Sequence, residues 1–155
     1  KLKISEINVA TNNSHPRRQG REAVLQALYA YEIAEEDRNK VLQDILDRKS
    51  YDENICNFIT NLFDSTVDNK EWCEGQIKSR LNNWEFDRVA LLDRLLLCVA
   101  ISEICFVDDV PPKVSISEAI EIAKQYSTEE SSSFVNGVLD NVYKTIAKET
   151  EKKSS

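Results

Sequence analysis

Three arginines near the start of the chain have the side-chain type and spacing to bind phosphate groups. Arg17, Arg18 and Arg21 lie in the stretch SHPRRQGREAVLQALYAYE, in which Ser14 and Pro16 are typical of a helix start. The first turns of a helix carry positive dipole charge, so cations there are disfavoured, and Arg17 and Arg21 also have the four-residue spacing of a like-charge pair. A bound polyanion would reverse both penalties, because free backbone N–H groups and guanidinium groups bind phosphate oxygens.

Two tyrosines further along the same stretch supply the aromatic half of a nucleic-acid site. Basic residues combined with aromatic rings that stack on unpaired bases are typical of single-stranded RNA sites. Tyr31 shares the apolar stripe of the expected helix and is better explained as a core residue, whereas Tyr29 lies off that stripe, on the side of Arg18. The alternative is a solvated helix end, the usual role of a charge run, but this leaves the unfavourable charge placement unexplained.

The charge of the chain is divided unevenly. Its 155 residues carry a net charge of −7, from 20 Lys and Arg against 27 Asp and Glu. Residues 1–21 contain five Lys and Arg and one Glu, a net +4, which leaves −11 for residues 22–155. The acidic remainder argues against a protein that coats nucleic acid over its whole surface, while a local basic site is compatible with it.

Catalytic and metal-binding chemistry find little support in the sequence. The single histidine is His15, there is no glycine-rich phosphate loop, and the four cysteines form no C-x-x-C pair. They lie in apolar helical surroundings and are expected to be small core residues of a reduced cytoplasm; they are Cys56, Cys73, Cys98 and Cys105. We therefore expect no enzyme activity, no metal and no cofactor.

The elements that must position the arginines are helical throughout. Only three Gly and three Pro occur, fewer than turn-rich β architectures need, and the apolar residues repeat with helical spacing. The stretch VALLDRLLLCVAISEICFV is apolar nearly all round but contains three charged residues, so it predicts a central buried helix and no membrane span. Asp87 is the expected cap of that helix. The expected helices span about 16–35, 38–48, 52 onward, 87–107 and 112–127, with a last one after the polar link STEESSS.

The stretch SSSFVNGVLD contains Asn136 and Gly137, a pair that normally marks a tight turn but here lies within a helical apolar stripe. Close helix packing is the simplest explanation for both residues. From the residues alone, Phe134 is compatible with a core anchor and with an exposed aromatic at a site, and the core is favoured.

Taken together, RRQGREAVLQALYAYE, DRLLLCVAISEI and VDDVPPKVSISEAIEIAKQYSTEESSSFVNGVLDNV resemble, in order and spacing, the NusB family of bacterial transcription antitermination factors. The resemblance covers about Arg17 to Val142. It implies an all-α fold, a compact helical domain of two packed three-helix halves. It also implies binding of the boxA element of nascent RNA together with NusE, a small-subunit ribosomal protein. Such a complex recruits other factors to RNA polymerase and supports ribosomal RNA synthesis.

The resemblance also implies which residues act. The family's arginine-rich helix start falls on Arg17, Arg18 and Arg21, and its RNA-facing tyrosine falls on Tyr29. The aromatic residue that opens the last helix falls on Phe134, which the resemblance moves from the core to the RNA site.

Partner binding and domain boundaries follow in the same way. An acidic–basic pair of the fourth helix, Asp93 and Arg94, is the expected contact with NusE. The expected organisation is a flexible leader (1–14), an N-terminal helical half (15–84), a C-terminal helical half (85–148) and a frayed tail (149–155). The rival hypothesis is a helical protein–protein adaptor without RNA binding, whose arginines dock an acidic partner.

Overall fold

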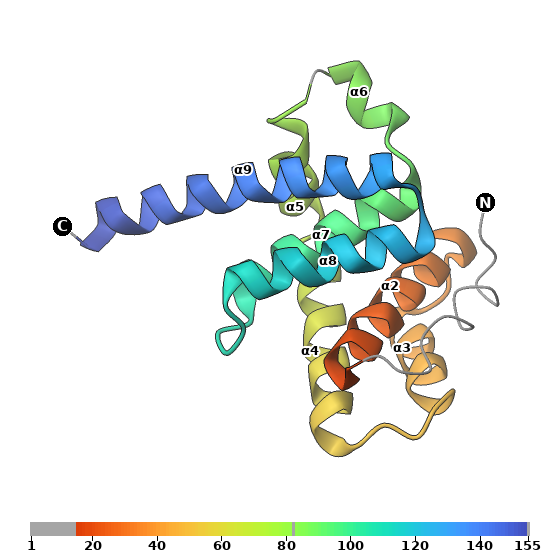
Figure 1. Cartoon of the computed structure of the whole chain (residues 1–155). Helices are drawn as coiled ribbons and strands as arrows, with labels where there is room; N and C mark the ends of the chain where they lie inside the picture. The colour runs from red at the N-terminus through yellow and green to blue at the C-terminus, as the bar shows by residue number, and fades with distance from the viewer. Residues whose placement is uncertain (1–14, 82, 155) are drawn as a thin grey trace. The chain divides into compact units, whose positions relative to one another are not determined.

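The computed structural model describes residues 15–81 and 83–154, without the side chains of 83–85 and 148–154 (Figure 1). No strand occurs in these ranges, so the predicted all-α class is confirmed. The expected leader, residues 1–14, lies outside the described residues. The helices are α2 (Pro16–Ala34), α3 (Arg38–Asp47), α4 (Glu53–Asp68), α5 (Lys70–Lys78), α6 (Asn83–Arg88), α7 (Leu91–Phe106), α8 (Pro112–Tyr126) and α9 (Glu129–Ser154).

By their internal contacts the helices form two compact units, the first ending at Asn69 and the second beginning at Lys70. We describe each unit by itself. Helix α5 belongs to the second unit. The domain boundaries expected from the sequence stay predictions; they are two helical halves, 15–84 and 85–148, and a frayed tail, 149–155. Across the described residues, none of the helices combines the length and the apolar character that crossing a membrane requires.

The first unit is built on the packing of α2 against α4, with α3 beside α2. Each of its helices has a polar side chain at its N-cap. His15 Nδ1 accepts a hydrogen bond from the Arg17 N–H (3.3 Å), and Asp37 and Asp52 cap α3 and α4 in the same way. The cap supplied by His15 fixes the start of α2, and therefore the turn on which the arginine cluster lies.

Ion pairs join α3 to α4 within the first unit. The Arg38 guanidinium lies 3.0 Å from Asp64 and 2.7 Å from Asp68, both on α4. These carboxylates raise the pKa of Arg38, with the hydrogen bond to Asp68 as the largest cause. The cation of α3 is thus held against α4.

The second unit has α7 at its centre, packed by α5, α8 and α9. Residues 95–103 of α7 are all buried, as expected for a helix that is apolar nearly all round. The expected start of this helix is wrong, however. Asp87 lies inside the short helix α6, and α7 begins after Ala90, which provides no side-chain cap. Val89 and Ala90 interrupt the helix that the sequence pattern joined into one.

The last helix also begins earlier than expected. The stretch STEESSS was predicted to be a link, but α9 starts at Glu129, and the Thr128 hydroxyl accepts a hydrogen bond from the Ser131 N–H (3.1 Å). Threonine and serine favour N-caps because their hydroxyls satisfy free backbone N–H groups. The polar run is therefore a cap and first turn, which moves Phe134 into the second turn of α9.

The cysteines are all free thiols. Cys73 and Cys98 are buried, and the Sγ of Cys73 lies 3.4 Å from the Ser102 hydroxyl. Burial raises the pKa of Cys73 and Cys98, and raises that of Cys105 to about 11. Thiols held in the protonated form are weak nucleophiles, in keeping with a packing role.

Candidate nucleic-acid interface

Two of the three clustered arginines lie on one aromatic ring. The guanidinium carbon of Arg17 is 4.7 Å from the centre of the Phe58 ring, and that of Arg21 is 5.3 Å from it. Phe58 belongs to α4 and is itself buried. A ring face attracts a cation, by about 0.5–2 kcal/mol depending on desolvation. The Phe58 ring of α4 therefore holds the guanidinium groups of Arg17 and Arg21 close together, although their like charges repel within α2.

Gly20 explains how α2 comes close enough to α4 for this arrangement. A Cβ atom added at Gly20 would lie 3.1 Å from Cδ2 of Phe58 and 3.5 Å from Cγ1 of Ile59. The first of these distances is tighter than a normal carbon contact, so any larger residue would displace the ring. A glycine inside a helix costs about 1 kcal/mol relative to alanine. Here it lets the Phe58 ring approach the turn that carries the arginines.

The arginines differ in exposure. Arg17 and Arg18 are partly exposed, whereas Arg21 is only 5% exposed. Arg21 is thus a buried member of the cluster, because its side chain lies over Phe58. Arg17 and Arg18 are the members with the most surface to offer a ligand.

The two tyrosines are both partly exposed, but only one has an aromatic partner among the described residues. Tyr31 meets Phe63 edge to face, with ring centres 6.4 Å apart. This contact supports the interpretation of Tyr31 as a core residue. Tyr29, eleven residues after Arg18 and thus close to the same face of α2, remains the candidate for base stacking.

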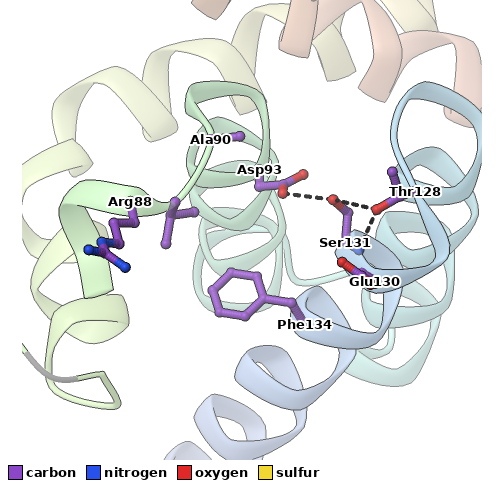
Figure 2. Close-up of a pocket in the computed structure, with 8 residues that line it drawn as sticks. Arg88, Ala90, Asp93, Thr128, Glu130, Ser131 and Phe134 are labelled. Atoms are coloured by element: carbon purple, nitrogen blue, oxygen red, sulfur yellow. Dashed lines mark hydrogen bonds between the residues drawn. The ribbon is translucent and has the colours of Figure 1, made fainter. Parts of the chain in front are cut away.

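In the second unit, Phe134 and Asp93 line one pocket of about 350 Å³ (Figure 2). The resemblance to the NusB family implied an RNA contact for Phe134 and a partner contact for Asp93, and the structure brings these two residues together. The pocket lies where α6, α7 and α9 approach one another, and its other lining residues are Arg88, Val89, Ala90, Thr128, Glu130 and Ser131.

Asp93 is held inside this pocket. It is 7% exposed and accepts a hydrogen bond from the Ser131 hydroxyl (2.9 Å), which Figure 2 shows as part of a chain leading to Thr128. Burial raises the pKa of Asp93, and the hydrogen bond from Ser131 opposes that rise. Arg94, its neighbour in sequence, lies instead over the Phe86 ring at 5.3 Å. Asp93 and Arg94, the expected contact with NusE, therefore lie in different environments.

We expect Asp93→Asn to raise the free energy of unfolding at pH 7. The folded-state pKa of Asp93 lies above its unfolded value, so the ionised side chain costs stability at neutral pH, and this cost disappears as the pH falls through the raised pKa. Asparagine keeps an oxygen for the Ser131 hydroxyl without the charge. Urea unfolding of both proteins between pH 7 and pH 4 should show an advantage for the variant that shrinks with acidity. An advantage that is absent, or constant with pH, would contradict this.

Two residues that support these candidate sites could not be recognised from the sequence. Phe58 belongs to an ordinary apolar stripe of α4, and nothing near it marks its ring as a support for cations. Ser131 lies in a run of serines of which only one reaches Asp93. The only local signal was the polar run itself, which contains both the cap and this hydroxyl.

The NusB family model matches residues 18–144, which is most of the chain. The chain belongs to the NusB family. Its similarity extends to individual members: it is 40% identical over 126 residues to the transcription antitermination protein NusB of Bacillus licheniformis, covering 81% of this chain and 95% of the relative. It is 45% identical over 131 residues to that of Chloroherpeton thalassium, covering 84% of this chain and 62% of the relative. The chain thus spans less than two thirds of the length of the Chloroherpeton relative.

Solved NusB structures share the fold. The NusB of T. maritima is 38% identical, with a TM-score of 0.77 over 84% of this chain and 92% of that one. A chain from the crystal structure of antitermination factors NusB and NusE in complex with dsRNA is 23% identical, with a TM-score of 0.76 over 84% of this chain and 97% of that one. At that identity the likeness concerns the fold alone. The expected NusB-like architecture is confirmed.

Proposed function

We propose that this chain is a non-catalytic transcription antitermination factor, which binds boxA-type single-stranded RNA together with NusE and supports rRNA transcription in the cytoplasm. Membership of the NusB family supports the proposal, because its relatives bear the name transcription antitermination protein. The observation that carries it within this chain is the placement of the Arg17 and Arg21 guanidinium groups on the Phe58 ring at the start of α2.

Each unit supplies its own proposed RNA contacts. In the first unit, Arg17 and Arg18 contact phosphate oxygens, Arg21 supports them from Phe58, and Tyr29 stacks on a base. In the second unit, Phe134 offers its ring at the pocket. These roles fit a single strand, since unpaired bases expose the faces on which aromatic rings stack.

The proposed partner site lies on α7. Asp93 is too buried for a broad contact, so NusE would meet the rim of its pocket, and Arg94 would contribute from beside Phe86. NusE would link the chain to the antitermination complex of RNA polymerase. The second candidate function is a protein–protein adaptor without RNA binding, in which the arginines dock an acidic partner.

We expect NusE and this chain together to bind boxA-like RNA at least about tenfold more tightly than this chain alone, a coupling of roughly 1.4 kcal/mol. The reason is charge: residues 22–155 carry −11, and a basic ribosomal protein would cover that surface and add its own phosphate contacts. Joining the two footprints makes the second contact effectively intramolecular.

A gel-shift titration of RNA with each protein, and then with the mixture, measures this coupling. A double-stranded RNA of the same sequence is the control for strand state, and a scrambled single strand is the control for sequence. A mixture that binds no better than its stronger component would rule out cooperative binding. Absence of binding to any of these RNAs would favour the adaptor.

A further inference from the structure

Two exposed aromatic side chains of the second unit lie against one another. Trp72 belongs to α5 and is 45% exposed, and Phe106 is the last residue of α7 and is 44% exposed. Their ring centres are 6.2 Å apart, with the ring planes tilted by 59°. Single exposed apolar residues are common on protein surfaces, whereas clustered Trp and Phe side chains are typical of the centres of protein interfaces. We call this pair the aromatic patch.

Gly75 leaves the Trp72 ring uncovered. It follows Trp72 by three residues on α5, so the two positions share one face of the helix. Helical side chains lean toward the N-terminus, and a side chain at the glycine position would therefore lie over Trp72. Gly75 is exposed, and a Cβ atom there would meet nothing within 4 Å, so the fold itself has room for a larger residue. Glycine is unfavourable inside a helix, which indicates that the open surface serves something outside the chain.

The surroundings of the aromatic patch are acidic. Segments 70–74 and 106–110, which carry the two rings, contain four carboxylates and one lysine. Glu71 and Asp108 are both exposed, and neither forms an ion pair in the described part of the chain. Their charges are therefore open to the cations of a partner.

We propose that the aromatic patch is the docking surface of a basic protein segment, one that presents an apolar side chain between lysine or arginine residues. The apolar side chain lies over Trp72, in the space above Gly75, and the basic residues pair with Glu71 and Asp108. RNA is a poor occupant, because its phosphates would face carboxylates here. A second copy of this chain is equally poor, since a two-fold dimer through the patch would set the same carboxylates against one another.

The aromatic patch is separate from the surfaces of the proposed function. Asp93, the expected contact with NusE, lies in the first turn of α7, whereas Phe106 ends that helix, about 20 Å further along its axis. The arginine cluster belongs to the first unit. The docking segment is therefore assigned to a protein other than NusE, and this inference can fail while the proposed function stands.

The test is a heteronuclear NMR titration of the isotope-labelled full chain with three synthetic peptides. The probe is the capped peptide KRLLRK, and the controls are KRSSRK, without the apolar side chains, and EELLEE, without the basic ones. We expect the probe to bind at least about tenfold more tightly than either control, because it alone meets both the rings and the carboxylates. The shifted signals should include the Trp72 indole. Equal binding of the three peptides, or displacement of the probe by NusE, would overturn the inference.

Variants of the aromatic patch locate the binding. Gly75→Gln places a side chain over Trp72, so it should weaken binding of the probe about fivefold or more while the free energy of unfolding stays equal or rises. Trp72→Ala should weaken binding about tenfold. Ile33→Ala is the matched control, because Ile33 is an exposed apolar residue of the first unit. Unchanged binding by Gly75→Gln, or equal losses in Trp72→Ala and Ile33→Ala, would also overturn the inference.

Discussion

Replacing Phe58 with alanine should lower the free energy of unfolding by about 3–5 kcal/mol, the usual cost of deleting a buried aromatic side chain. Phe58 is 7% exposed and packs between α4 and the start of α2, where its ring also supports Arg17 and Arg21. The variant would therefore lose both apolar burial and the surface beneath two cations. Urea denaturation followed by circular dichroism measures the change.

Phe58→Leu separates the two contributions. Leucine keeps most of the apolar volume, so the loss of stability should be about 1.5 kcal/mol or less, but it has no ring face for the guanidinium groups. We expect this variant to remain folded and to bind boxA-like RNA more weakly than the unchanged protein. RNA binding equal to that of the unchanged protein would mean that the ring does not position the arginines.

Substituting alanine for Arg17, Arg18 and Arg21 should flatten the salt dependence of RNA binding. Each phosphate contact on a single strand contributes a slope of about −0.7, so the two partly exposed arginines account for about −1.4 and all three for at most about −2. Single variants should divide the effect: Arg17→Ala and Arg18→Ala change the slope, and Arg21→Ala also lowers stability because its side chain is buried on Phe58.

The measurement is RNA affinity over a range of salt concentrations for each variant. Lys124→Ala is a suitable control, since Lys124 is an exposed cation of α8 already paired with Glu121. An unchanged slope in the triple variant would show that the cluster does not touch RNA, and the adaptor would become the leading hypothesis.

The sequence was sufficient for the helices because their signals are local. The helix that begins near residue 52 and the apolar run of α7 were predicted, whereas the boundaries near Asp87 and Thr128 were wrong. Those errors share a cause: a short interruption or a cap depends on individual backbone groups, which periodicity does not register.

The site was harder to predict because it depends on contacts distant in sequence. The unfavourable charges of Arg17 and Arg21 were visible, but the ring that accommodates them lies two helices away. The burial of Asp93 was likewise hidden, and its hydrogen-bond partner Ser131 belongs to another helix.

The stacking of Arg17 and Arg21 on Phe58 has a consequence for the thermodynamics of association. Immobilising a long side chain at an interface usually costs about 0.5–1.5 kcal/mol in entropy. In this chain that ordering takes place when α2 packs on α4, before any RNA arrives. Calorimetry should therefore show a smaller entropic penalty for RNA binding by the unchanged protein than by Phe58→Leu, in which the same arginines are released to move.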